Sequence, residues 1–171
     1  MKDWQKILQE ELIPAVIGDH FWENSLLEIA HNDISPAGLH LAIFVKPYLS
    51  YVLEGKKTVE SRFATKRFAP YGQVATGDVI LLKQSSGPIL GLSLVSQVWF
   101  YNLDTESLKQ LRKDFTDALC AQDPSFWRQR EQASFATLMR LTSVRAVSPV
   151  AFPKRDQRGW VVLRPSSVLF Q

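Results

Sequence analysis

The pattern of hydrophobic and polar positions changes character near residue 38. Before this point apolar residues recur at helical spacing in two groups, separated by Pro14 and Gly18-Asp19, which predicts two helices. The apolar positions are Trp4, Ile7, Leu8 and Leu12, followed by Phe21, Leu26, Leu27 and Ile29. A segment of this length cannot bury a core of its own. We therefore predict that residues 1–38 form a helical N-terminal extension, which packs on the domain formed by residues 39–171 or on a partner.

After residue 38 the apolar runs are mostly short and rich in β-branched and aromatic residues, which predicts strands. Pro47 begins a short helix that Gly55 ends, and a long loop covers residues 64–76. Two further helices follow, the first with Asp104 or Thr105 as its N-cap and the second after Asp123. The predicted strands cover residues 39–45, 57–63, 79–83, 89–101, 137–147 and 160–163.

Several of these strands follow one another with no helix between them, which argues against a doubly wound parallel sheet. We predict an α+β fold, built as a mixed, antiparallel-rich and partly closed β-barrel with flanking helices. Composition agrees, since 46% of the residues are hydrophobic and 22% are charged, as in an ordinary globular protein. No segment approaches the apolar length of a membrane span, and the first residues lack the apolar core of a signal peptide.

The single cysteine, Cys120, excludes an internal disulfide and lies in an apolar run, which predicts a buried structural thiol. We expect a cytoplasmic protein; the sequence leaves its oligomeric state open, with a monomer favoured. The net charge of +3 is a mild basic bias, and the position of the charges matters more than their sum. The three histidines lack metal-ligand spacing, and no glycine loop of the phosphate-binding type is present, so we expect neither a metal nor a cofactor.

Candidate chemistry is concentrated in residues 55–62. On a strand, Thr58, Glu60 and Arg62 share one face, and Lys57 lies at the corner where it can join them. A carboxylate beside two cations stays ionised and orients them, which suits a polar heteroaromatic group or a phosphate. In a desolvated pocket Glu60 is a candidate base and Lys57 a candidate proton donor. The alternative interpretation is a solvated strand face with weak surface ion pairs.

Two flanking stretches interleave cations with aromatic residues, as single-stranded RNA binding requires. One contains Lys66, Arg67 and Phe68, and the other, residues 154–160, contains Arg158. Both line one cleft if the last strand lies near the first. The alternative is that Phe63 and Phe68 only anchor a loop while the charges are solvated.

The octapeptide Gly55-Lys56-Lys57-Thr58-Val59-Glu60-Ser61-Arg62 resembles the G-x-K-x-x-E-x-R signature of ASCH domains, a branch of the PUA-like superfamily. Its context is similar as well, from Val45-Lys46-Pro47 through Gly77-Asp78 to Arg158-Gly159-Trp160, so the resemblance covers about residues 40–165. It implies a PUA-like β-barrel whose cleft is lined by Lys57, Glu60 and Arg62. RNA or nucleotide binding is the role expected of that family.

The resemblance also implies two possible reactions. One branch of the family hydrolyses the N-acetyl amide of acetylated cytidine, but it has a threonine nucleophile where this sequence has Glu60. Thr58 is two residues early, and Asp114 is only a loose counterpart of the acidic residue that this branch carries on a later helix. Other relatives are linked to RNA cleavage, for which Lys57 and Arg62 would stabilise a phosphorane while Glu60 acts as base.

We rank three hypotheses. The first is an RNA- or nucleotide-binding domain, with the ligand-binding residues Lys57, Glu60, Arg62, Lys66, Arg67, Phe68 and Arg158. The second is a small hydrolase acting on RNA or a modified nucleoside, with Lys57 and Glu60 as the catalytic pair. The third is a protein-interaction module that uses residues 1–38, and an exposed patch of Trp4, Phe21 and Trp22 would favour it.

Overall fold

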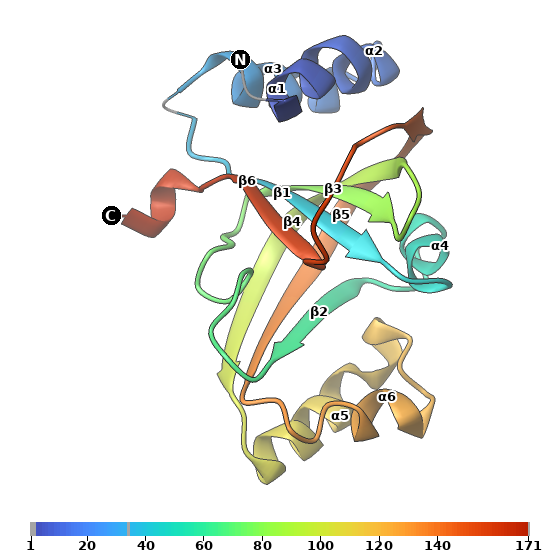
Figure 1. Ribbon diagram of the computed structural model, residues 1–171, viewed down its shortest axis with the longest axis vertical. Coiled ribbons are helices and arrows are strands. Elements are labelled where there is room, and N and C mark those ends of the chain that lie inside the picture. Colours follow the sequence, from blue (N-terminus) through green and yellow to red (C-terminus); the bar gives the residue numbers. More distant parts are fainter. Residues whose placement is uncertain (1–2, 34, 171) are drawn as a thin grey trace.

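One mixed sheet organises the molecule. The computed structural model describes residues 3–33 and 35–170, and within them six strands form a single sheet in the order β2-β5-β4-β3-β1-β6 (Figure 1). The strands are β1 (Leu39–Phe44), β2 (Val59–Ala64), β3 (Val79–Gln84), β4 (Ile89–Asn102), β5 (Phe135–Val150) and β6 (Trp160–Arg164). Strands β1 and β3 pair in parallel, and the other neighbours are antiparallel. The predicted mixed, antiparallel-rich sheet is therefore confirmed.

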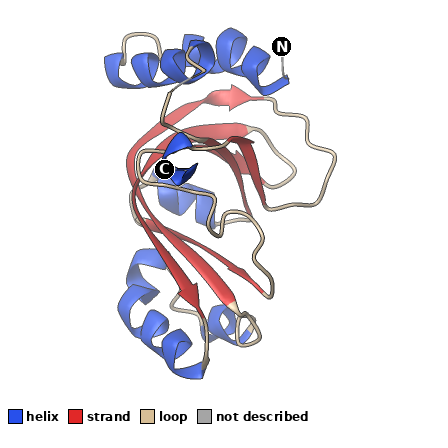
Figure 2. Ribbon diagram, turned by 90° about the vertical axis from the view of Figure 1, so that its left-hand side faces the viewer, coloured by secondary structure: helices blue, strands red, loops and turns tan. Residues whose placement is uncertain are grey.

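The sheet curls into a half-barrel, as Figure 2 shows. Its longest pair, β4 with β5, shifts register at three places along its length, and such bulges increase the local twist and bend of a strand. The end strands of the order are β2 and β6, so the half-barrel leaves these two edges without a backbone partner in the sheet. The predicted partly closed β-barrel is confirmed in this form.

The first helices cover one end of the sheet (Figures 1 and 2). Three short helical segments follow one another directly and together form the first helical stretch; the middle one has π-helical hydrogen bonding. A longer helix, α3, comes after them. Their buried side chains, among them Leu12 and Leu26, form one hydrophobic cluster with Leu41 and Leu81 of the sheet. The segments are α1 (Asp3–Ile7), η1 (Leu8–Leu12), α2 (Ile13–Ala15) and α3 (His20–His31). The boundary at residue 38 stays a prediction, but the helices share their core with the sheet.

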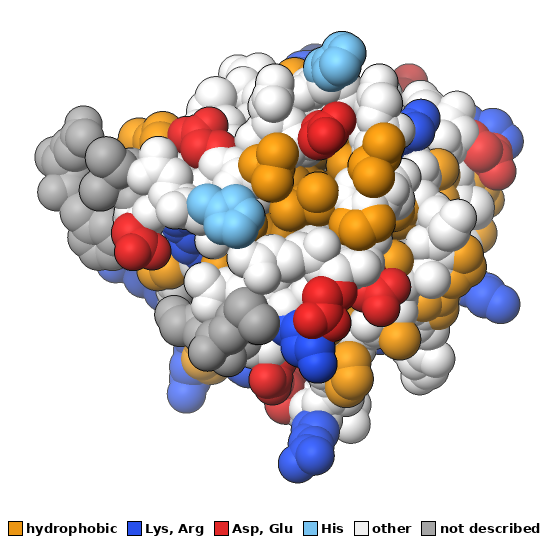
Figure 3. Space-filling view, turned by 90° about the horizontal axis from the view of Figure 1, so that it is seen from above, with side chains coloured by type: hydrophobic (Ala, Val, Ile, Leu, Met, Phe, Trp, Pro, Cys, Tyr) orange, Lys and Arg blue, Asp and Glu red, His pale blue; other side chains and the backbone are white. Residues whose placement is uncertain are grey.

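The aromatic residues of these helices do not form the exposed patch that would favour a protein-interaction module. Trp22 is 2% exposed, and its indole nitrogen donates to the Ser143 carbonyl oxygen at 3.1 Å. Trp4 is half-buried, whereas Phe21 is 48% exposed. Figure 3, which looks onto this end of the molecule, shows hydrophobic side chains gathered among acidic and polar ones. Burial of both tryptophans counts against a docking surface built on them.

Two helices cover the opposite end of the sheet, and a third lies beside it. α5 (Thr105–Leu119) begins with a capping box between Asp104 and Ser107, and α6 (Pro124–Arg128) begins after Asp123, as predicted. Their buried residues form a cluster with Val59 of β2 and Leu138 of β5. α4 (Tyr48–Leu53) connects β1 with β2. A last 3₁₀ turn, η2 (Ser167–Phe170), was not predicted from the hydrophobic pattern.

The cysteine prediction is only partly correct. Cys120 ends α5 in the left-handed conformation, with φ 54°, and its side chain is half-buried rather than part of the core. Cys120 lies at the end of a helix, where side chains are only partly covered by the packed layer. The apolar run around Cys120 does not show that the helix ends there. Within the described part of the chain, no helix has the length and apolar character required to cross a membrane.

A buried polar network joins β1, β3 and β6. The indole nitrogen of Trp160 donates to Nδ1 of His40 at 3.2 Å, so Nε2 of His40 carries the proton and donates to the Asp78 carboxylate at 2.9 Å. The same carboxylate accepts from the backbone N–H groups of Gly38, at 2.7 Å, and Ala75, at 2.8 Å. Asp78 therefore satisfies three buried or partly buried donors at the point where the chain enters β3.

Replacing Asp78 with alanine should leave these donors unpaired. We expect Asp78→Ala to lower the free energy of unfolding by about 3 kcal/mol or more, since each unsatisfied buried polar group costs roughly 1–3 kcal/mol. Urea denaturation followed by circular dichroism measures the change. Asp114→Ala, an exposed carboxylate on α5, is the control and should leave the midpoint where it is. Equal midpoints in both variants would contradict the structural role of Asp78.

Candidate ligand-binding cleft

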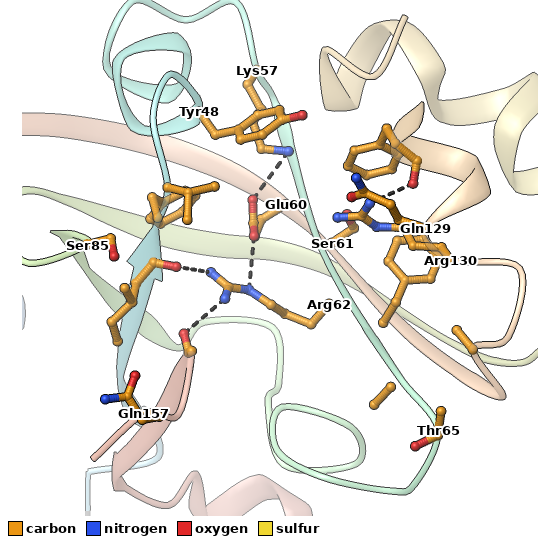
Figure 4. Close-up of a pocket in the computed structure, with 18 of the residues that line it drawn as sticks. Tyr48, Lys57, Glu60, Ser61, Arg62, Thr65, Ser85, Gln129, Arg130 and Gln157 are labelled. Carbon is orange, nitrogen blue, oxygen red and sulfur yellow. Dashed lines mark hydrogen bonds and ion pairs between the residues drawn. The ribbon is translucent and has the colours of Figure 1, made fainter. Parts of the chain in front are cut away.

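A cleft of about 670 Å³ runs along the unpaired edge of β2 (Figure 4). The Leu141 N–H of β5 donates to the Thr58 carbonyl oxygen, directly before β2. In an antiparallel ladder every second residue bonds to the partner strand, so Glu60 and Arg62 also turn their backbone groups toward β5. The backbone N–H and C=O groups of Ser61 and Phe63 therefore face the other way, toward the cleft. The side chains around the cleft come mainly from β1, β2, α4 and the region of α6, and they include Phe44, Tyr48, Lys57, Glu60, Arg62, Phe126, Gln129 and Arg130.

Lys57, Glu60 and Arg62 form one connected ion-pair chain in this cleft. The Glu60 carboxylate lies 3.3 Å from Nζ of Lys57 and 3.0 Å from Nε of Arg62. The N–H of Arg62 Nε is not aimed at the carboxylate, so this contact is an ion pair and not a hydrogen bond. Lys57 is 3% exposed and Glu60 is 6% exposed, which makes the interpretation of a solvated strand face wrong. Thr58 is exposed and lies outside the lining.

Lys57 is held by backbone as well as by charge. Its ammonium donates to the carbonyl oxygens of Val59, at 2.8 Å, and Leu119, at 3.2 Å, and lies 5.6 Å from the centre of the Tyr48 ring. Burial lowers the pKa of Lys57, and the nearby Glu60 carboxylate opposes this shift. Burial also raises the pKa of Tyr48, whose ring forms one wall of the cleft. The position of the lysine is thus fixed by the carbonyl oxygens of Val59 and Leu119, the Glu60 carboxylate and the Tyr48 ring.

Arg62 connects the free edge of β2 to the strands across the gap. Its two terminal nitrogens donate to the carbonyl oxygens of Gly159, at 2.9 Å, and Ile43, at 3.0 Å. The guanidinium also lies 5.4 Å from the ring centres of Phe44 and Trp160. This side chain therefore joins β2 to the end of β1 and the start of β6. β2 forms no backbone ladder with either of these two strands.

The chain contributes a third cation that sequence reasoning missed. Arg130 stacks on Phe126, with 3.5 Å from its guanidinium carbon to the ring centre, and on Phe63 at 5.3 Å. Its Nη1 donates to the Phe126 carbonyl oxygen at 2.6 Å, and burial lowers its pKa. Its spacing of one helical turn from Phe126 was a signal available in the sequence. The cleft holds three cationic side chains against one carboxylate, so it favours an anionic ligand.

The flanking residues predicted to bind ligand do not all reach this cleft. Lys66 and Arg67 are exposed and lie outside its lining. Arg67 stacks instead on Tyr71, at 5.9 Å, and Phe135, at 5.3 Å. Asp114, the loose counterpart of a catalytic acid, lies on the surface of α5, where Gln110 donates to it, and is not part of the cleft lining.

Phe68 and Arg158 line a second cavity of about 780 Å³. Arg158 is ion-paired with Asp156 at 2.8 Å, and Phe68 is 62% exposed. Phe63 belongs to the hydrophobic cluster beneath α5 and α6, so the anchoring interpretation holds for Phe63 and is wrong for Phe68. Gly159, which precedes β6, lines both cavities, so the last strand does lie near the signature residues.

Comparison with solved structures identifies the fold. The ASCH protein of Zymomonas mobilis is 15% identical and superposes with a TM-score of 0.59, over 74% of this chain and 87% of that chain. A serine-to-alanine variant of that protein gives a TM-score of 0.62 at 14% identity, over 77% of this chain and 92% of that chain. A protein from Enterococcus faecalis is 11% identical, with a TM-score of 0.50 over 80% of this chain and 97% of that chain.

The protein therefore has the fold of these ASCH structures, with helices flanking a curled sheet. No protein-family model matches the sequence, and no curated protein matches it. At these identities the likeness defines the architecture, and the chemistry of the cleft has to be argued from the residues of this chain.

A double-mutant cycle tests whether Lys57 and Glu60 act as one buried unit. We expect Lys57→Met and Glu60→Gln each to lower the free energy of unfolding by about 3 kcal/mol, because each leaves a partner charge buried. The double variant should lose about 1–3 kcal/mol less than the two single losses together. Lys56→Ala with Glu54→Ala, an exposed pair in the same turn, is the control cycle and should show no coupling. Additive losses for Lys57 and Glu60 would contradict the buried ion pair.

Proposed function

We propose that the protein binds single-stranded RNA or a nucleotide, and that it holds a nucleotide in the cleft beside Lys57, Glu60 and Arg62. The observation that carries this proposal is the cleft itself, where three cations and several aromatic rings surround one buried carboxylate along a free strand edge. Cations neutralise phosphates and aromatic rings stack on unpaired bases. The ASCH-type fold agrees with this proposal, although the similar structures are related only in architecture.

Each part of a nucleotide finds a suitable group in the cleft. Arg130 lies against Phe126 and near Phe63, and it is already stripped of part of its water, so a phosphate gains a cation at little further desolvation cost. Glu60 is an acceptor for an amino or imino N–H of a base. The backbone N–H and C=O groups of Ser61 offer a paired donor and acceptor to the edge of a base. Tyr48 and Phe126 provide apolar walls.

Arg130 gives the sharpest test, because Lys57 and Arg62 also hold the fold together. We expect Arg130→Gln to weaken binding of single-stranded RNA about tenfold at moderate salt. It should also reduce the slope of log affinity against log salt by about 0.7, the value for one phosphate contact. Fluorescence anisotropy with a labelled RNA over a salt series measures both quantities. Arg128→Gln, an exposed arginine at the end of α6 and two residues before Arg130, is the matched control.

A small effect of Arg128→Gln beside a large effect of Arg130→Gln places the phosphate in the cleft. Equal, small losses in both variants, with the wild-type protein still binding RNA, would mean that the RNA lies elsewhere on the surface. Failure of the wild-type protein to bind RNA or nucleotides would refute the proposed function.

A second candidate function is hydrolysis of RNA or of a modified nucleoside. Two observations favour it: burial lowers the pKa of Lys57, and its ammonium lies 3.3 Å from the Glu60 carboxylate, so the two form a possible proton-transfer pair. We rank it second because Lys57 already donates to two carbonyl oxygens and the Glu60 carboxylate is already ion-paired with Lys57 and Arg62. Thr58 is exposed and outside the lining, so the amidase that acts through a threonine is the weaker version.

Glu60→Gln separates the two functions. If the protein is a hydrolase with Glu60 as base, this variant should lose turnover by a factor of about 100 or more while it still binds RNA. Gel analysis of RNA degradation measures the turnover, at a temperature where the variant is still folded. Absence of degradation by the wild-type protein under conditions where it binds RNA would remove the hydrolase candidate.

A further inference from the structure

We propose that the second cavity is a subsite for a neighbouring base of the same RNA strand, with Phe68 as its stacking platform. This inference rests on the proposed function and adds to it a minimum ligand length of two nucleotides. The two cavities share Arg62, Phe63, Ala64 and Gly159 in their linings. A ligand that fills both therefore passes beside Arg62, which lines both cavities.

The lining of the second cavity is aromatic. Phe68, Tyr71, Phe135 and Trp160 all contribute to it, and the rings of Tyr71 and Phe135 are packed edge to face at 5.0 Å. Packed rings of this kind form a rigid wall. Phe68 differs from them, since more than half of its surface, 62%, is exposed. An exposed ring in the lining of a cavity offers a face on which an unpaired base can stack.

The charges around this cavity match a phosphate-linked ligand. Arg158 lines it, with its side chain 66% exposed, and uses Nη2 to hold Asp156. Arg67 stacks on the outer side of the Tyr71 and Phe135 wall. An aromatic cavity with arginines at its rim is the combination that sequence-tolerant single-strand binding uses. An uncharged apolar ligand would leave these cations without a function in the complex.

The position of Phe68 is fixed by its loop. The Phe68 N–H donates to the Lys66 carbonyl oxygen at 2.8 Å, and the Tyr71 N–H donates to the Phe68 carbonyl oxygen at 2.9 Å. Farther along, the Ala75 N–H donates to Asp78, which the His40 and Trp160 network holds in the core. The ring is therefore presented by an ordered turn, and the loss of side-chain freedom on stacking is confined to its own rotamer.

Competition binding tests the subsite. A nucleoside monophosphate, the corresponding dinucleotide and a single-stranded RNA of ten nucleotides compete with a labelled RNA for the wild-type protein and its variants. We expect the dinucleotide to bind wild-type protein about tenfold or more tighter than the mononucleotide, because one further base is stacked. Phe68→Ala should remove this gain and leave mononucleotide affinity unchanged. Phe68→Tyr, which keeps a ring, should retain the gain, whereas Phe68→Leu should lose it.

Phe21→Ala is the control, because Phe21 is an exposed phenylalanine on α3 at the other end of the molecule, and it should change neither affinity. If the mononucleotide binds but the dinucleotide binds no more tightly, or if Phe68→Ala keeps the gain, the subsite is refuted while the proposed function stands. If no nucleotide or RNA binds wild-type protein, the proposed function fails and the subsite fails with it. Equal losses for Phe68→Ala and Phe21→Ala would likewise refute the subsite.

Discussion

The Arg62 guanidinium is the interaction on which the rest of this structure depends. A sheet of six strands that curls only half-way leaves two edges apart, and Arg62 reaches from one of them to the carbonyl oxygens of Ile43 and Gly159 on the other side. Glu60 neutralises the guanidinium, and Lys57 balances Glu60 in turn. The same residue that bridges the gap also lines both cavities, so it contributes to the architecture and to the proposed binding surface at once.

Much of the fold was predictable, because local patterns determine its elements. The strands follow from short β-branched runs, and α5 and α6 follow from the capping residues Asp104 and Asp123. The order of the strands was not predictable in detail, since it depends on pairing between strands that are far apart in the sequence, such as β2 with β5. The half-buried Cys120 and the last 3₁₀ turn were missed because both lie at the margins of the packed layers.

The candidate site was predictable in part. The spacing of Lys57, Glu60 and Arg62 indicated a constellation, but only packing shows that Leu119 and Val59 help to bury and hold the lysine. Arg130 escaped notice because its importance comes from Phe63, which lies far away in the chain. The flanking residues were correctly singled out as a group of cations and aromatic rings, yet they divide between the surface and a second cavity. Such a division depends on how a loop folds back, which residue composition does not encode.

One consequence follows from the bond between Lys57 and Leu119. Leu119 is the last residue of α5, so its carbonyl oxygen stands at the negative end of fifteen aligned peptide dipoles. The ammonium therefore feels the electric field of a whole helix, which partly offsets the loss of water around it. The protonation state of the cleft is in this way coupled to the integrity of a helix whose other residues lie outside it. A change that frays the end of α5 would be felt first as a change in the charge of the cleft.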